Sequence, residues 1–221
     1  MPKSILPLFS WLITLLAPFA VIMLVVRLLL TPVFLQIEYR MPGFPADSYG
    51  FSQADRLRWA TPSLAYLTND AGIDFLADLK FDDGTPIYNE RELSHMLDVK
   101  IVVQKLLNAW LLVLGLLAAL AIWARLANWL PEYRLGWRRG GFLTLGLLLT
   151  ISLFAAVSFW QFFTLFHSLF FSGDSWLFEF SDTLIRLFPL RFWQDCVIFI
   201  GGLSVLLGLA LGFGLKPHKK A

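Results

Sequence analysis

The fold is decided by the stretch Asn89-Glu-Arg-Glu-Leu-Ser-His-Met-Leu-Asp-Val-Lys100, which begins in polar sequence and runs into a long apolar segment. Asn89 is a favourable helix N-cap, and Glu92, three residues later, completes a capping box. No proline interrupts the sequence before Pro131. We therefore expect one continuous helix that begins in water, passes the headgroup layer and crosses a bilayer.

Two histidines lie beside apolar segments. His95 and Asp98 occupy positions i and i+3 of the expected helix, so they share one face. The Asp98 carboxylate either sets the tautomer of His95 or only solvates the helix end, and the sequence leaves both open. The second histidine, His167, lies at the edge of another apolar segment. We interpret the protein as a device that brings these two histidines together at a membrane surface.

The composition is that of an integral membrane protein. The 221 residues are 57% hydrophobic and 15% charged, with a mean hydropathy of +0.67. A soluble domain averages about 45–50% apolar and about 25% charged residues. The single cysteine, Cys196, lies inside an apolar segment. An intramolecular disulfide, a thiolate metal cluster and a CxxC redox pair are therefore excluded.

Four apolar runs exceed the length of about 18 residues that marks a membrane span. They are Leu8–Leu30, Ile101–Leu130, Phe142–Phe166 and Arg191–Leu215. We predict an all-α membrane protein with four transmembrane helices and a single integral membrane domain over residues 1–221. Arg27, near the end of the first span, either snorkels to the headgroups or is a functional intramembrane charge.

Residues 31–100 carry most of the acidic side chains and are predicted to form a small cap on the membrane part. Ser52-Gln-Ala-Asp55 resembles a helix start, and the helix should end before Pro62. Asp82-Asp83-Gly84 is typical of a tight turn, here between Phe81 and Ile87 in a hairpin. We expect short helices and one hairpin in this segment.

The distribution of basic residues predicts the orientation. A loop at Pro131–Gly141 contains Arg134, Arg138 and Arg139, and lysines lie at both ends of the chain, at Lys3, Lys216, Lys219 and Lys220. Short loops rich in Lys and Arg stay in the cytoplasm. Both termini are therefore predicted to be cytoplasmic, and the cap and the link at 172–189 extracytoplasmic. Both histidines then lie on the same outer side, at the same depth.

The chemistry of the site follows from the two imidazoles, because histidine is the natural proton carrier near neutral pH. Asp174 and Asp182 follow His167 and either orient it or are only solvated. Arg186 binds a lipid phosphate, stabilises an oxyanion, or pairs with Asp182 four residues earlier. No GxSxG motif is present, which disfavours a covalent acyl-enzyme. Two histidines without a nucleophile suit direct transfer, one as base and one as acid, and the assignment stays open.

Other classes of protein were weighed against this one. His95 and Asp98 supply too few ligands for a metal, and no phosphate-binding or dinucleotide fingerprint occurs, so we expect no metal and no cofactor. The basic residues form no patch suited to nucleic acid. One alternative is a haem b electron-transfer protein with His95 and His167 as axial ligands. Another is a membrane scaffold with a binding cap and no enzymatic activity.

Two stretches resemble the signature stretches of the lipoprotein intramolecular transacylases: Arg91-Glu-Leu-Ser-His-Met-Leu-Asp-Val-Lys100 and Phe166-His-Ser-Leu-Phe-Phe-Ser-Gly-Asp-Ser-Trp-Leu-Phe178. So do Asp182-Thr-Leu-Ile-Arg-Leu-Phe-Pro189 and Phe192-Trp-Gln-Asp195. The resemblance implies that His95 and His167 are catalytic. It also implies the activity: the sn-2 acyl chain of a diacylglyceryl lipoprotein moves to the α-amine of the same lipidated cysteine.

This resemblance implies that the partners are diacylglyceryl-modified bacterial lipoproteins and membrane lipids, met in the cytoplasmic membrane. The product is N-acyl, S-monoacylglyceryl cysteine. The attack closes a ring of roughly eight atoms, which is entropically poor, so positioning must contribute much of the rate. We expect aromatic side chains to hold the acyl chains and exclude water, namely Phe163, Phe166, Phe170 and Trp176.

Overall fold

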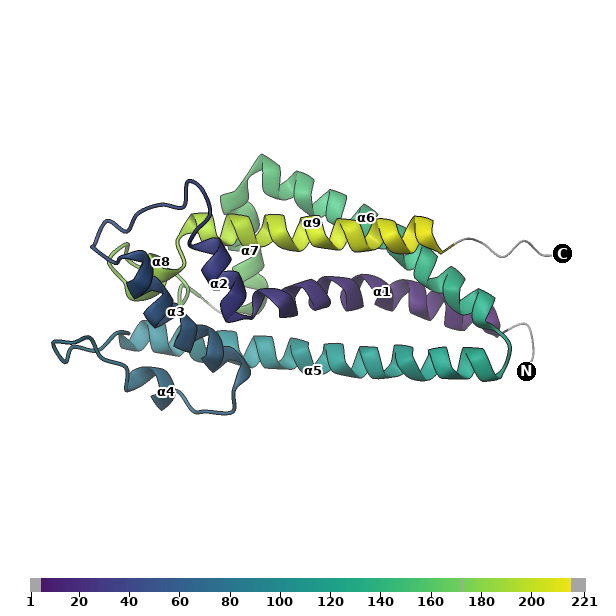
Figure 1. Ribbon diagram of the computed structural model, residues 1–221, viewed down its shortest axis with the longest axis horizontal. Helices are drawn as coiled ribbons and strands as arrows, with labels where there is room; N and C mark the ends of the chain where they lie inside the picture. The colour runs from purple at the N-terminus through teal and green to yellow at the C-terminus, as the bar shows by residue number, and fades with distance from the viewer. Residues whose placement is uncertain (1–4, 172, 216–221) are drawn as a thin grey trace. The chain divides into compact units, whose positions relative to one another are not determined.

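The computed structural model describes residues 5–171 and 173–215, and these are helical with no β-strand (Figure 1). The helices are α1 (Leu6–Leu29), α2 (Pro32–Glu38), α3 (Gln53–Thr68), α4 (Asp74–Ala77), α5 (Glu90–Leu126), α6 (Leu130–Val157), α7 (Phe159–Phe170), α8 (Thr183–Leu187) and α9 (Leu190–Gly214). The predicted all-α class is confirmed. The terminal lysines Lys3, Lys216, Lys219 and Lys220 lie outside the described residues.

Four of the described helices, α1, α5, α6 and α9, are long and apolar enough to cross a membrane. The first and fourth predicted spans agree with α1 and α9 to within two residues. The other two spans have different bounds.

The chain divides into two compact units, each described here by itself. The membrane unit comprises residues 1–26, 107–157 and 198–221, and the cap unit comprises residues 27–106 and 158–197. The cap unit thus contains the predicted cap together with α7, α8 and the start of α9. That the whole chain is a single integral membrane domain stays a prediction.

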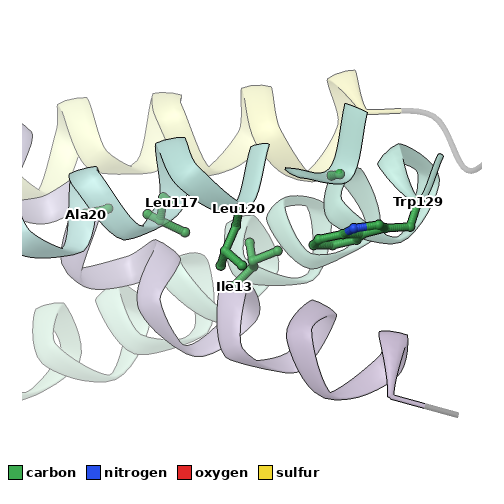
Figure 2. Packing of buried hydrophobic residues seen from close by; sticks show 6 residues of the cluster. Ile13, Ala20, Leu117, Leu120 and Trp129 are labelled. Atoms are coloured by element: carbon green, nitrogen blue, oxygen red, sulfur yellow. The ribbon is translucent and has the colours of Figure 1, made fainter. Parts of the chain in front are cut away.

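The membrane unit is held by a core of buried apolar side chains and by close helix contacts (Figure 2). Figure 2 shows Ile13 and Ala20 of α1 facing Leu117 and Leu120 of α5, with the Trp129 ring beside them. Because lipid is as apolar as these side chains, close packing rather than the hydrophobic effect must stabilise the contact.

The predicted second span ends earlier than expected. α5 stops at Leu126, and Asn128 adopts a left-handed backbone conformation with φ 59°. The Trp129 N–H donates to the Ala124 carbonyl at 2.9 Å, which is the long hydrogen bond of a Schellman cap. Asparagine tolerates this conformation, so the helix turns three residues before Pro131 rather than at it.

The predicted loop at Pro131–Gly141 is wrong, since these residues form the first turns of α6. Pro131 is tolerated there because the first turn has no intrahelical N–H bonds to lose. The glycines of this stretch, Gly136, Gly140 and Gly141, are packing positions. A Cβ added at Gly141 would lie 2.7 Å from the backbone of Gly208 and Gly212 in α9.

The predicted third span, Phe142–Phe166, is broken in two. Ser158 takes an extended conformation, with φ −155°, and its side chain accepts a hydrogen bond from the Gln161 N–H. It therefore ends α6 and caps α7, a helix of 12 residues that is too short to span a bilayer. His167 lies on α7, not at the end of a span.

The cap has the predicted helix start at Ser52, which forms a complete capping box, but α3 continues through Pro62 to Thr68. Hydroxyls of Thr61 and Ser63 donate to backbone carbonyls one turn earlier, at Leu57 and Trp59. These two bonds flank the Arg58 carbonyl, which Pro62 leaves without its usual N–H donor.

The predicted hairpin is reduced to a tight turn. Gly84 has φ 85°, and a single antiparallel bridge joins Lys80 to Pro86. Pro86 has no N–H to donate, so pairing does not extend into regular strands.

Candidate active site

The structure brings the two histidines together inside the cap unit. The ring centroids of His95, on α5, and His167, on α7, are 6.3 Å apart, with an interplanar angle of 21°. Both residues are buried, 8% and 7% exposed. Two helices far apart in the sequence therefore present a pair of imidazoles to one small volume, at a separation that a substrate group could bridge.

His167 is held in one tautomer by its own helix. Its Nδ1 lies 2.8 Å from the Phe163 carbonyl oxygen, one turn earlier. A carbonyl can only accept, so Nδ1 carries the hydrogen and the neutral ring presents the Nε2 lone pair. Burial lowers the pKa of His167 below its ordinary value, against the opposing effect of this hydrogen bond. His167 is therefore neutral at physiological pH.

His95 is positioned by the start of α5, where the predicted capping box is present. The Asn89 side-chain oxygen accepts the Glu92 N–H at 3.0 Å, and a Glu92 carboxylate oxygen accepts the Asn89 N–H at 2.8 Å. A cap of this kind is worth about 1 kcal/mol. The Nδ1 atom of His95 is buried without a hydrogen-bond partner among the described residues. The capped first turns of α5 therefore hold an imidazole whose Nδ1 forms no hydrogen bond within the described residues.

Aromatic rings enclose both imidazoles. The Phe163 and Trp176 ring centroids lie 4.1 and 4.7 Å from that of His167. Phe166 and Phe170, the other two predicted pocket residues, follow on α7 and are 47% and 40% exposed. The Phe166 ring centroid lies 5.6 Å from that of His167, so three of the four predicted aromatics pack against His167, while Phe166 and Phe170 also leave apolar surface open.

The sequence did not indicate which aromatic side chains pack against His95. The ring centroids of Phe171 and Phe178 lie 5.0 and 5.3 Å from that of His95, and Phe171 is also 5.7 Å from His167. Phe171 lies in the segment that follows α7 and packs against the rings of both histidines. A haem between the two imidazoles would have to displace it. Aromatic residues were abundant around His167, but nothing in the sequence showed which two reach His95.

Within the described residues, no hydrogen bond joins Asp98, Asp174 or Asp182 to either histidine. Asp174 is exposed on the turn before Leu177. Asp182 accepts hydrogen bonds from the side chains of Asn89, at 3.0 Å, and Arg91, at 2.7 Å. Asp182 therefore ties the α8 end of the link to the start of α5 and does not reach His167.

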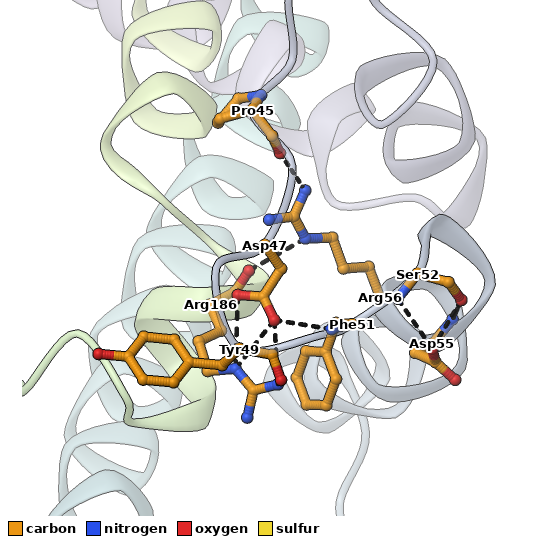
Figure 3. Close-up of polar contacts among 8 residues, drawn as sticks. All are labelled: Pro45, Asp47, Tyr49, Phe51, Ser52, Asp55, Arg56 and Arg186. Carbon is orange, nitrogen blue, oxygen red and sulfur yellow. Dashed lines mark hydrogen bonds and ion pairs between the residues drawn. The ribbon is translucent and has the colours of Figure 1, made fainter.

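Arg186 forms an ion pair with Asp47, which was not among the three alternatives that the sequence left open (Figure 3). Its guanidinium is 3.0 Å from the Asp47 carboxylate and stacks 3.5 Å from the Phe51 ring centroid. Burial raises the pKa of Asp47, but hydrogen bonds from Arg186 and the Phe51 N–H outweigh it and hold that pKa below its ordinary value. The pairing with Asp182 is wrong, because α8 turns Arg186 toward the loop before α3.

Arg56 strengthens the same junction. Its guanidinium donates to the Arg186 carbonyl at 3.1 Å and to the Pro45 carbonyl at 2.6 Å. Figure 3 shows the two guanidinium groups on either side of the Asp47 carboxylate. This network joins the cap loop to α8. Within the described residues, no group of three or more His, Cys, Asp or Glu side chains has a geometry suited to a metal ion.

Four apolar helices define a multi-pass membrane protein, and the cap unit contains a buried pair of histidines. The family model of the lipoprotein intramolecular transacylase Lit matches residues 11–193. The chain belongs to this family, as its two signature stretches predicted, and is therefore an acyltransferase that acts in lipoprotein processing.

Two individual proteins are similar to the chain. A protein of Aquifex aeolicus, described as uncharacterized, is 29% identical over 215 residues, covering 93% of this chain and 92% of the relative. The solved structure of a histidine-to-arginine variant of Lit from Bacillus cereus has a TM-score of 0.63 at 22% identity and covers 94% of this chain and 92% of its own. The second likeness shows the shared membrane fold.

Proposed function

We propose that the protein transfers the sn-2 acyl chain of a diacylglyceryl lipoprotein to the α-amine of the same N-terminal cysteine, with His95 and His167 as its proton carriers. The product is the N-acyl, S-monoacylglyceryl form. The observation that carries the proposal is the pair of buried imidazoles, 6.3 Å apart between ring centroids, in a chain of this family. The geometry of each ring suggests its role.

His167 is the base. Its Nδ1 hydrogen is engaged by the Phe163 carbonyl, so Nε2 is the atom available to take a proton. The α-ammonium of a peptide has a pKa of about 7.7–8.0, and the attacking nitrogen must lose a proton before it is nucleophilic. His167 removes this proton, and the amine then attacks the ester carbonyl.

His95 completes the proton transfer. When the C–N bond forms, the nitrogen still carries a proton that it must lose to become an amide. As the C–O bond breaks, the glyceryl oxygen must gain one. His95 carries the proton from nitrogen to oxygen, so the ester becomes an amide and a free hydroxyl while the first proton leaves through His167. This assignment uses the two imidazoles for the two different transfers.

The aromatic rings around the imidazoles favour attack on the ester by the amine over attack by water. Phe163, Trp176, Phe171 and Phe178 pack against the imidazoles and reduce the access of water, which would otherwise hydrolyse the ester. The exposed faces of Phe166 and Phe170 offer apolar surface for the acyl chains. Positioning in this pocket offsets the entropy of closing the medium-sized ring.

The decisive experiment follows the acyl chain. A lipopeptide with isotope-labelled acyl chains is mixed with an unlabelled one of different peptide mass, and both are incubated with the protein in vesicles. Mass spectrometry should show the label on the nitrogen of its original peptide only. Label on the other peptide, or on the protein, would reject intramolecular transfer.

A further inference from the structure

The carboxylate of Glu92 joins two helices that are far apart in the sequence. Its side chain is 1% exposed. One oxygen accepts the N–H of Asn89, the N-cap of its own helix α5, at 2.8 Å. The other accepts the N–H of Leu184, in the first turn of α8, at 2.7 Å. A capping box ordinarily serves only its own helix. Here the same carboxylate also satisfies a backbone donor 92 residues away.

A second set of contacts joins the same two helix starts. Asp182, the N-cap of α8, accepts hydrogen bonds from Asn89 and Arg91 of the α5 start. The Arg91 guanidinium lies 5.7 Å from the centroid of the Phe178 ring, which in turn lies 5.3 Å from that of His95. The segment between α7 and α8 is therefore anchored to the same turns of α5 that carry His95.

The position of Glu92 relative to His95 makes this anchor relevant to catalysis. The two residues are three apart in α5, one turn of a rigid helix. The segment that leads from α7 to α8 begins with Phe171, which contacts both imidazoles. Glu92 is therefore linked to the histidine pair along two routes: along α5 to His95, and through α8 and the segment that follows His167.

We propose that Glu92 is a positioning residue of the transacylase, which sets the geometry of the histidine pair by clamping the start of α8 to the start of α5. The inference rests on the proposed function, because it gives Glu92 a role only if the pair is catalytic. It predicts a loss in the chemical step that exceeds any loss of folding or binding.

A second capping box in the same unit offers a matched control. Ser52 and Asp55 form the same reciprocal bonds at the start of α3, with the Ser52 N–H donating to Asp55 at 2.8 Å. Asp55 is partly exposed, and its side chain accepts hydrogen bonds from Ser52 at the start of its own helix. Asp55→Ala therefore removes a helix cap without touching the clamp.

The experiment compares Glu92→Gln, Glu92→Ala and Asp55→Ala in the vesicle assay. Gln has the shape of Glu but only one accepting oxygen, so one of the two N–H groups loses its partner. We expect Glu92→Gln to lower kcat about tenfold and Glu92→Ala about a hundredfold, with KM within about twofold, as small misplacements at a reacting centre do. Asp55→Ala should keep its kcat. Because the chain has three histidines, isotope labelling of histidine gives a resolvable spectrum, and Glu92→Gln should shift the His95 ring signals.

Several results would overturn the inference. A kcat within about twofold of the parent in Glu92→Gln, or a loss confined to KM, would do so, as would unchanged His95 signals. If Glu92→Ala does not fold, the isosteric Glu92→Gln decides alone. His95→Ala is assayed alongside. Full activity in that variant defeats the proposed function itself, whereas an inactive His95→Ala beside fully active Glu92 variants defeats only the clamp.

Discussion

The hydrogen bond from His167 to the Phe163 carbonyl distinguishes the two imidazoles at the scale of single residues. His95 Nδ1 has no such partner among the described residues. Because the two rings differ in this way, we assign them different proton transfers in one reaction, and neither histidine can then substitute for the other.

We predict that His95→Ala and His167→Ala each lower kcat by about 10²–10⁴-fold, the usual contribution of a general acid or base. The double variant should be little worse than either single one, because groups that act as a unit are not additive. Turnover is measured by mass spectrometry, with the unfolding midpoint as the control for folding. Strictly multiplicative losses would count against a shared step.

The pH dependence follows from the burial of His167. Burial lowers the pKa of His167 below 6.5, so most of the rings are neutral and able to accept a proton at about pH 7. We predict that kcat falls as the pH is lowered and the base becomes protonated, with the midpoint of this acid limb below 6.5. The measurement is kcat at saturating substrate from pH 5 to 9. An acid limb of kcat centred above about pH 7 would contradict the assignment.

At the scale of elements, α6 packs through glycine. A Cβ at Gly141 would lie 2.7 Å from backbone atoms of Gly208 and Gly212, whereas one at Gly146 meets nothing within 4 Å. Because backbone cannot move aside as a flexible side chain does, α6 and α9 would have to separate.

We predict that Gly141→Ala destabilises the protein by about 1–3 kcal/mol, the usual effect of overpacking. Gly146→Ala, five residues later in the same helix, is the matched control and should leave stability unchanged or slightly raised. The measurement is the unfolding midpoint in detergent. Equal midpoints for the two variants would show that this contact is not tight.

At the scale of the whole molecule, the orientation in the membrane rests on charge. Arg134, Arg138 and Arg139 lie in the first turns of α6, and the lysines at the chain ends add to the same predicted side. We propose that both termini face the cytoplasm and that the cap, with the histidine pair, faces outward.

Cysteine labelling tests this topology. Asp83 and Arg134 are exposed, whereas the Arg139 guanidinium lies 4.8 Å from the centroid of the Trp11 ring and is a poorer site. In a Cys196→Ala background, Asp83→Cys should react with a membrane-impermeant maleimide in intact cells, and Arg134→Cys only after permeabilisation. Reaction of both residues in intact cells would refute the orientation.

The sequence by itself determined the features that depend on composition and on neighbours along the chain. These are the all-α class, the bounds of α1 and α9, and the capping boxes at Ser52 and Asn89. It also identified the family and placed His95 and His167 at one site. Apolar length and cap chemistry are local properties, so they can be read without coordinates.

Only the tertiary structure decided which groups meet across the chain. Arg186 pairs with Asp47, 139 residues away, and not with Asp182, the N-cap of its own helix. Phe171 and Phe178 reach His95 because the segment after α7 folds back onto the start of α5. Gly136, Gly140 and Gly141 of α6 pack against neighbouring helices and do not form a loop. Each outcome depends on the direction in which a helix points a side chain or a bare backbone, and the packing of all the elements together sets that direction.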